Sequence, residues 1–552
     1  MRDGIELNAD VFRPEVDGAF PAIVSFHPYE PVGQWAPGEV QAFGAMRPNQ
    51  ERGAAAYEAG DPNFFVRRGY AHVITSIRGT ATSGGAYPFL NDPEPLDGYD
   101  LVEWVARQPW CDGNVGMFGV SYLGRIQYFV ASAQPPHLRC IFAPWGGTDL
   151  YRDSLYHGGI LAKNWAQNWP RGMTIHHYNS ECRAAGEDAY RSAIDQALAD
   201  PDLRAEPGIV APLQSAREAN DPTGKNDLVA DILTNPHDNA FWDKRRARYQ
   251  DIKVPVYTGA DWGIFGLHLP AAFRSWLSLN TPKKMVIGPP CYIERPVYQP
   301  AYESLRWFDY WLKGMDTRIM DEPNVRMFIS QTRRWRTSSD WPLPETRWTP
   351  LYLHEGGVLW EHEHFPNEGC SSFSDSPWGR GGLEFTTPKL VEDTEVIGPI
   401  GLTLYGSTTD DEVLWFASLR EVFPDGGKHL LTRGWLRGSH RAIDQARSQP
   451  WAPYHPHDHS QPLEPGKIYE FQIGLVPTGQ LLKAGTRLEL RISCTDDQPN
   501  NAQENLGSGH LRRQAPSRVT VFHNEDYPSE LLLPVTSGNV MGLYISGGEP
   551  YL

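Results

Sequence analysis

The sequence is poor in cysteine and has no closely spaced cysteine pair. Six cysteines are spread over 552 residues, at positions 111, 140, 182, 291, 370 and 494. This spacing argues against a disulfide framework and against a zinc knuckle. The histidine-rich stretch His455-Pro-His-Asp-His459 lies among prolines, and we predict a solvated loop there rather than a metal site. We therefore expect no bound metal.

Positive charge and long apolar runs are also scarce. The formal net charge is -17, and no long run of lysine and arginine occurs. We therefore expect neither nucleic acid nor an anionic membrane as a partner. No apolar stretch is long enough to span a bilayer, and the first residues lack the apolar core of a signal peptide, so we expect a cytoplasmic protein. Without a Gly-x-Gly-x-x-Gly turn after a strand or a phosphate-binding loop, no cofactor is expected.

The first part of the sequence alternates between strand-like and helix-like segments. We predict strands at 9–13, 22–26, 71–76, 115–120 and 141–144, with helices at 100–106 and 125–132. Alternation of this kind predicts a mostly parallel sheet with helices on both faces. The fold class is therefore α/β.

Two changes of character divide the rest of the chain. Residues 150–244 are polar, helix-compatible and rich in tryptophan, which predicts an inserted helical cap. The α/β pattern then resumes, with strands at 254–258 and 284–287 and helices at 270–277 and 302–313. After residue 323, short alternating runs separated by glycine, proline and aspartate predict an antiparallel β-sandwich.

Ser121 lies at the centre of the most informative motif. An apolar run ends in the small-residue turn Gly119-Val-Ser-Tyr-Leu-Gly124, and a helix-compatible run follows. This order of strand, sharp turn, serine and helix is typical of a nucleophile elbow. Gly119 would let the turn close, and the helix N-terminus behind Ser121 would favour developing negative charge. The alternative is a serine that only caps a helix.

Further motifs occur in a fixed order along the chain. They are Phe26-His-Pro-Tyr29, Arg78-Gly-Thr80, Ser83-Gly-Gly85, Asp97-Gly-Tyr-Asp100, Gln108-Pro-Trp110, Gly398-Pro-Ile-Gly-Leu-Thr-Leu-Tyr405, Gly434-Trp-Leu-Arg-Gly-Ser-His440 and Ala484-Gly-Thr-Arg-Leu-Glu-Leu490. With these motifs the chain resembles, from end to end, the CocE/NonD hydrolases, the group of cocaine esterase and the X-Pro dipeptidyl-peptidases.

The resemblance implies an organisation in three parts. Residues 1–149 and 245–322 would form an α/β-hydrolase domain, 150–244 its helical cap, and 323–552 a C-terminal jelly-roll domain. It also implies that Ser121 is the nucleophile and that the Tyr29 hydroxyl and the Tyr122 backbone N–H form the oxyanion hole. Members of this group often self-associate, so a homodimer is possible.

The acid and the base of the expected triad are harder to place. Asp261 is the only carboxylate in the loop expected after strand 254–258, but it does not align with the family acid, so it is either a substitute or a turn residue. The family histidine falls on Tyr292, and tyrosine is a poor base near neutrality. His268 is the nearest histidine in sequence and is retained as a catalytic candidate, although a structural role is also possible.

These departures leave three functions open. The first is serine-dependent hydrolysis of an ester or amide of a small carbonyl compound. The second is a repurposed non-hydrolytic reaction, such as cyclisation, rearrangement or C–C bond chemistry in a biosynthetic pathway, and the third is an inactive binding protein. The tryptophans of the cap favour a small aromatic or polycyclic ligand. Candidate substrate-binding residues are His27, His157, Trp165, Trp169, Trp262 and Tyr292.

Overall fold

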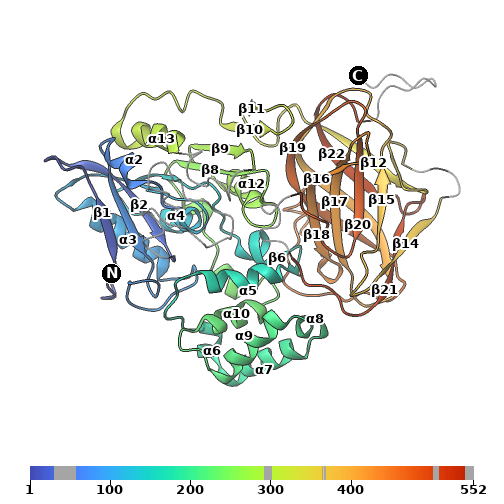
Figure 1. The fold of residues 1–552 in the computed structure, drawn as a ribbon, viewed down its shortest axis with the longest axis horizontal. Helices are drawn as coiled ribbons and strands as arrows, with labels where there is room; N and C mark the ends of the chain where they lie inside the picture. Colours follow the sequence, from blue (N-terminus) through green and yellow to red (C-terminus); the bar gives the residue numbers. More distant parts are fainter. Residues whose placement is uncertain (30–57, 291–300, 364, 366–367, 501–508, 541–552) are drawn as a thin grey trace. The chain divides into compact units, whose positions relative to one another are not determined.

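The computed structural model describes residues 1–29, 58–290, 301–363, 365, 368–500 and 509–540 (Figure 1). The chain divides into two compact units. The first unit comprises Met1–Ser154, Asn164–Asn235 and Asn239–Arg326. The second comprises Leu155–Lys163, Pro236–Asp238 and Met327–Leu552. Each unit has its own sheet and core.

A mostly parallel sheet forms the centre of the first unit. Its strands are β1 (Ala9–Phe12), β2 (Phe20–His27), β3 (Ala71–Ser76), β4 (Cys111–Phe118), β5 (Leu138–Phe142), β8 (Val256–Asp261) and β9 (Lys283–Gly288). They follow the order β1-β3-β2-β4-β5-β8-β9, continued by β10 (Val325–Ile329), the strand in which this unit ends, and by β11 (Arg334–Ser338). β1 is antiparallel to β3, and the pairs from β3 to β9 are parallel. The predicted α/β sheet is therefore present.

Small residues let the helices approach this sheet closely. The helices around it are α2 (Pro62–Val66), α3 (Glu94–Ala106), α4 (Tyr122–Ser132), α12 (Leu269–Ser278) and α13 (Ala301–Lys313). A Cβ at Gly116 of β4 would lie 2.9 Å from the Phe308 ring of α13, and one at Gly98 of α3 would lie 2.1 Å from Val130 of α4. Phe308 and Trp307 belong to an apolar cluster that also includes Phe118 and Phe142.

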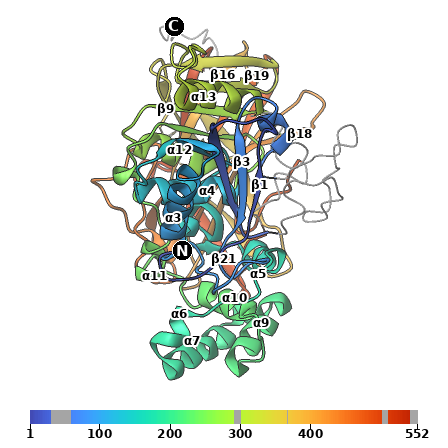
Figure 2. The same cartoon turned by 90° about the vertical axis from the view of Figure 1, so that its left-hand side faces the viewer.

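A helical segment is inserted between β5 and β8. It contains the π-helix η1 (Tyr151–Leu155), β6 (Tyr156–His157), β7 (Ile160–Leu161), α5 (Lys163–Gly172), α6 (Glu181–Ala185), α7 (Glu187–Ala199), α8 (Pro201–Arg204), α9 (Pro207–Glu218), α10 (Lys225–Leu233), α11 (Ala240–Asp243) and the 3₁₀ turn η2 (Tyr249–Asp251). Figure 2 shows α6, α7, α9 and α10 grouped together. The insertion is helical as expected, while its role as a cap stays a prediction.

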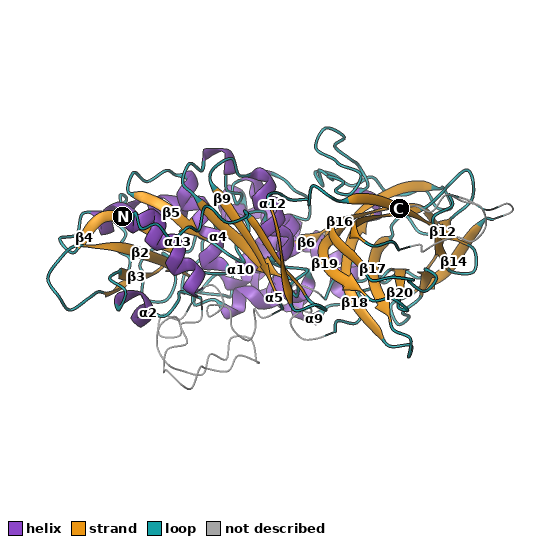
Figure 3. Cartoon of the chain, turned by 90° about the horizontal axis from the view of Figure 1, so that it is seen from above, coloured by secondary structure: helices purple, strands orange, loops and turns teal. Residues whose placement is uncertain are grey.

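The second unit contains a sheet whose strands are mostly antiparallel. They are β12 (Arg347–His354), β13 (Val358–Trp360), β14 (Cys370–Asp375), β15 (Gly382–Thr386), β16 (Thr394–Thr408), β17 (Leu414–Val422), β18 (Lys428–Arg437), β19 (Tyr469–Leu482), β20 (Arg487–Ser493), β21 (Ser517–Phe522) and β22 (Glu530–Ser537), with the short turn η3 (Gly438–His440). One pair, β13 and β15, is parallel. β22 pairs with both β12 and β16, which closes the sheet around an apolar core. Figure 3 draws strands of this sheet, among them β16, β17 and β18, in orange. The all-β prediction for this region is confirmed, and the jelly-roll topology remains a prediction.

Several details differ from the expectations. Helix α3 begins at Glu94, six residues before the predicted helix, because its first residues are also buried. Asp261 is the last residue of β8 rather than part of the loop that follows. His455 and His457 are buried rather than solvated, and His455 is hydrogen-bonded at both ring nitrogens to the backbone oxygens of Ala442 and Gln472.

Among the helices in the described ranges, none has both the length and the apolar character that crossing a membrane requires.

Candidate active site

Ser121 occupies a strained turn between β4 and α4. Its backbone angles are φ 58° and ψ -123°, a conformation that non-glycine residues rarely adopt. Holding such a conformation costs about 1–3 kcal/mol and is typical of functional sites. The serine is the residue immediately before α4, so its side chain lies beside the positive end of the helix dipole. The elbow geometry expected from the sequence is therefore present.

Close backbone packing holds this turn in place. A Cβ at Gly119 would lie 2.4 Å from the Leu123 Cβ, and one at Gly124 would lie 2.8 Å from the Pro144 carbonyl oxygen. Gln127, one turn further along α4, donates from its amide to the backbone oxygens of Gly119 (3.1 Å) and Leu123 (2.8 Å). Neither glycine leaves room for a side chain, so the local sequence determines the shape of the elbow.

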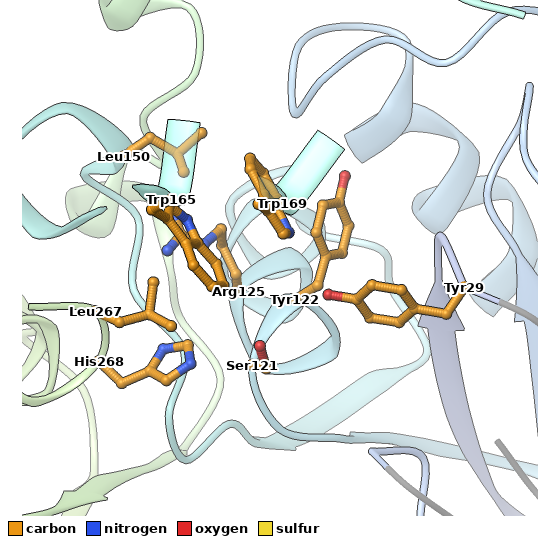
Figure 4. Close-up of a pocket in the computed structure, with 9 residues that line it drawn as sticks. All are labelled: Tyr29, Ser121, Tyr122, Arg125, Leu150, Trp165, Trp169, Leu267 and His268. Atoms are coloured by element: carbon orange, nitrogen blue, oxygen red, sulfur yellow. The ribbon is translucent and has the colours of Figure 1, made fainter. Parts of the chain in front are cut away.

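Ser121 lies in a small pocket within the first unit (Figure 4). The pocket is lined by Tyr29, Ser121, Tyr122, Arg125, Leu150, Trp165, Trp169, Leu267 and His268. The two tryptophans come from α5 and stack with their ring centroids 6.0 Å apart. The pocket therefore combines an apolar wall with a few polar groups, which is the composition of small-molecule sites.

Tyr29 points its hydroxyl group toward Ser121 (Figure 4). The side chains of Ser121 and Trp169 are close enough to act on this hydroxyl. Burial, more than any other cause, raises the pKa of Tyr29 well above its ordinary value of 10.0, so the phenol keeps its proton. A neutral phenol beside the nucleophile can donate a hydrogen bond to an oxyanion.

Tyr122 is fixed by a buried chain of hydroxyl and carboxyl groups. Its hydroxyl donates to Glu94 Oε1 (2.7 Å) and accepts from the Tyr87 hydroxyl (3.0 Å). Glu94 also accepts from the Leu90 N–H at 3.0 Å. Burial raises the pKa of Glu94 to about 8, because a buried carboxylate loses its hydration. The chain orients the residue whose backbone N–H is the second expected oxyanion donor.

His268 is part of the same pocket, although it lies far from Ser121 in the sequence. Its ring points into the pocket on the side of Ser121 (Figure 4). Burial, with a smaller contribution from the charge of Arg125, holds the pKa of His268 well below 6.5. The imidazole is therefore neutral at physiological pH, which is the state that accepts a proton.

Arg125 is a polar residue of the pocket that the sequence reasoning missed, together with the wall residues Leu150 and Leu267. It lies one turn after Ser121 on α4, and its backbone N–H donates to the Ser121 carbonyl oxygen (2.8 Å). Its guanidinium donates to Ser154 Oγ at 3.0 Å. The signal was present in the sequence: a charged residue opens the otherwise apolar helical run after the elbow.

Several predicted site residues do not line the pocket. Asp261 is buried and accepts hydrogen bonds from Trp145 Nε1 (3.2 Å) and the Gly263 N–H (2.8 Å). His27 is buried at the end of β2, where it accepts from the Tyr29 N–H (3.3 Å), and burial lowers its pKa to about 3. Trp262 packs against Phe273 with their ring centroids 6.1 Å apart.

Two further candidates lie elsewhere. His157 belongs to the second unit, where its Nδ1 is 2.8 Å from His510 Nε2 and its ring stacks on Trp435. Tyr292, the position of the family histidine, lies outside the described residues. Within the described ranges, no three His, Cys, Asp or Glu side chains come together in an arrangement that could hold a metal ion.

Two regions of the chain match known families. Residues 3–290 match the X-Pro dipeptidyl-peptidase (S15) family, and residues 317–532 match the X-Pro dipeptidyl-peptidase C-terminal non-catalytic domain. The first match covers more than half of the chain and includes Ser121, Tyr29 and His268.

Relatives and solved structures extend over nearly the whole chain. The cocaine esterase of Rhodococcus sp. (strain MB1 Bresler) is 26% identical over 97% of both chains. A putative serine esterase of Mycobacterium bovis is 27% identical over 78% of this chain and 79% of that protein. The crystal structure of a CocE/NonD family hydrolase from Staphylococcus aureus is 25% identical, covers 97% of this chain and 92% of its own, and has a TM-score of 0.79. The chain therefore belongs to the X-Pro dipeptidyl-peptidase (S15) family and is similar to the CocE/NonD hydrolases.

Proposed function

We propose that this protein is a serine-dependent acyl hydrolase that cleaves an ester or amide of a small carbonyl compound. The observation that carries the proposal is the position of Ser121 on a strained elbow, in one pocket with Tyr29 and His268. Relatives with the printed names cocaine esterase and putative serine esterase support the same class of reaction.

The residues take the following roles in this proposal. His268 accepts the proton of Ser121 Oγ as the oxygen attacks the acyl carbon. The carbonyl oxygen becomes an oxyanion, which accepts hydrogen bonds from the Tyr29 hydroxyl and the Tyr122 backbone N–H. His268 then protonates the leaving alcohol or amine, and a water molecule, deprotonated by the same imidazole, releases the acyl group from Ser121. Leu150, Leu267 and the two tryptophans of α5 bind the apolar part of the substrate.

A non-hydrolytic reaction is the second candidate, and one observation favours it. The residue at the family histidine position is Tyr292, and the pKa of His268 is held far below the value of an ordinary catalytic base. With a weak base, the oxyanion donors still polarise a carbonyl group, which suits cyclisation or rearrangement.

Covalent labelling and turnover separate these functions. We expect a fluorophosphonate to label wild type at Ser121, and a panel of acyl esters and X-Pro amides to include substrates that are hydrolysed. Ser121→Ala should lose both properties. Ser132→Ala is the matched control, because Ser132 ends the same helix and its hydroxyl donates only to the Phe129 carbonyl (2.7 Å). Absence of labelling together with absence of turnover in wild type would reject the hydrolase.

A further inference from the structure

The guanidinium of Arg125, a residue that lines the pocket, has an unused hydrogen-bond donor. Nη2 donates to Ser154, whereas Nη1 is buried and finds no hydrogen-bond partner among the described residues. The Arg125 side chain is almost fully buried, with 4% of the residue exposed. A buried donor without a partner destabilises the fold, and more strongly when the group is charged. Such a cost is expected where a ligand supplies the missing acceptor.

Arg125 also lacks a counter-ion in this part of the fold. Asp153 is close enough to act on it electrostatically, but the Asp153 carboxylate binds Arg274 directly at 2.9 Å. The neighbouring Asp149 pairs with Arg152 (3.2 Å) and Arg246 (3.1 Å). Within the described ranges Arg125 itself forms no ion pair, and burial lowers its pKa below the usual value, an effect that the charge of Asp153 opposes only in part.

The position of Arg125 relates this charge to the nucleophile. Ser121 immediately precedes α4, Arg125 lies in the first turn of α4, and both residues line the same small pocket. A ligand with its carbonyl carbon at Ser121 therefore shares this pocket with Arg125. Leu150, Leu267 and Trp165 provide apolar surface on the remaining wall.

We infer that Arg125 binds a carboxylate of the substrate, so that the pocket selects acyl compounds with a carboxylate a few carbon atoms from the scissile carbonyl. A half-ester of a short dicarboxylic acid has this chemistry. Arginine suits the role because its fixed N–H groups match a carboxylate in charge and geometry. The inference rests on the proposed function, since it names the substrate class of the same site.

The test compares two esters on one enzyme. The 4-nitrophenyl half-ester of glutaric acid has a carboxylate, and 4-nitrophenyl pentanoate is a neutral analogue of similar length. We expect wild type to have the higher kcat/KM for the half-ester. In Arg125→Met the ratio of the two kcat/KM values should fall about 10- to 100-fold, the effect of one charge-assisted hydrogen bond. The ratio cancels any general loss of activity in the variant.

Arg217→Gln is the control, because Arg217 is an exposed arginine on α9 that pairs with Asp195. It should keep the wild-type ratio. An equal or lower kcat/KM of wild type for the half-ester, or an unchanged ratio in Arg125→Met, would overturn the inference while leaving the hydrolase intact.

A second measurement does not depend on turnover. Glutarate alone should raise the thermal unfolding midpoint of wild type and of Ser121→Ala, and should have no such effect on Arg125→Met. If no ester is cleaved, the hydrolase proposal fails, and this comparison still decides the carboxylate site. An equal shift in Arg125→Met, or no shift in wild type, would show that Arg125 does not bind the anion.

Discussion

The hydroxyl group of Tyr29 faces the side chain of Ser121 in the pocket that both residues line (Figure 4). Trp169 of α5 lines the same pocket and also acts on this hydroxyl. Tyr29 therefore lies between the helical insertion and the elbow. This arrangement keeps the donor in position before a substrate enters, which is the condition for electrostatic stabilisation of an oxyanion.

Replacing Tyr29 by phenylalanine tests this role. Tyr29→Phe removes the hydroxyl and keeps the ring, so we expect kcat to fall about 100- to 1,000-fold with a small change in KM. Steady-state kinetics on an ester that wild type cleaves is the measurement. Tyr70→Phe is the control, because it removes another buried hydroxyl, bonded to Asp309 at 2.7 Å, outside the pocket. A Tyr29→Phe enzyme with wild-type kcat would exclude this residue from the oxyanion hole.

His268 is expected to be the general base despite its low pKa. His268→Gln should reduce kcat/KM about 100- to 10,000-fold, the usual contribution of a positioned base. Because the pKa of His268 lies well below 6.5, the acid limb of the wild-type pH profile should also lie below that value. Tyr292→Phe serves as the comparison. A large loss of kcat/KM in Tyr292→Phe, combined with full activity in His268→Gln, would assign the proton transfer to Tyr292 instead of His268.

Substrate charge should alter this pH profile. The positive charge of Arg125 contributes to the low pKa of His268, and a bound carboxylate would offset that charge. We expect the acid limb of kcat, which reports the enzyme–substrate complex, to lie at higher pH for the glutarate half-ester than for the pentanoate ester. Profiles for the two esters on wild type provide the measurement. Superimposable acid limbs would show that the anion does not bind beside Arg125.

Glu94 should make stability depend on pH in an unusual direction. Burial raises its pKa from 4.5 to about 8, so the folded state holds a proton that the unfolded state releases. Its contribution to the free energy of unfolding is fully present below pH 4.5 and is lost as pH rises to about 8. Urea unfolding at pH 5 and pH 8 should show this loss in wild type and a smaller loss in Glu94→Gln. Glu218 is an exposed acid on α9, and Glu218→Gln should behave as wild type. If Glu94→Gln lost as much unfolding free energy between pH 5 and pH 8 as wild type does, the prediction would be contradicted.

Gly124 should tolerate no side chain. A Cβ there would lie 2.8 Å from the Pro144 carbonyl oxygen and 3.2 Å from the Gly119 oxygen, so the elbow would have to shift. We expect Gly124→Ala to lower the free energy of unfolding by about 1–3 kcal/mol and to reduce labelling of Ser121. Gly172→Ala, at the end of α5 with no atom within 4 Å of the added Cβ, should be neutral or slightly stabilising. Equal stability of the two variants would be evidence against a tightly packed elbow.

The sequence alone was sufficient for the parts of the fold that depend on local patterns. Apolar runs located β2, β3 and β9, because a strand buried on both faces is apolar throughout. The glycines around Ser121 located the elbow, since only residues without a side chain fit the turn between β4 and α4. Ordered motifs along the whole chain identified the family, which the comparisons confirm.

Only the tertiary structure decided which side chains share the pocket. His268 follows Ser121 by 147 positions, and no local pattern relates the two; the parallel strands bring their ends to one edge of the sheet. Asp261 lies near His268 in the sequence, but its place at the end of β8 directs its carboxylate to Trp145 and Gly263. The same holds for Arg125. The helical pattern of the sequence places this arginine on α4, but it does not show that the side chain is buried with an unpaired donor. Both properties follow from the packing of the segments around it.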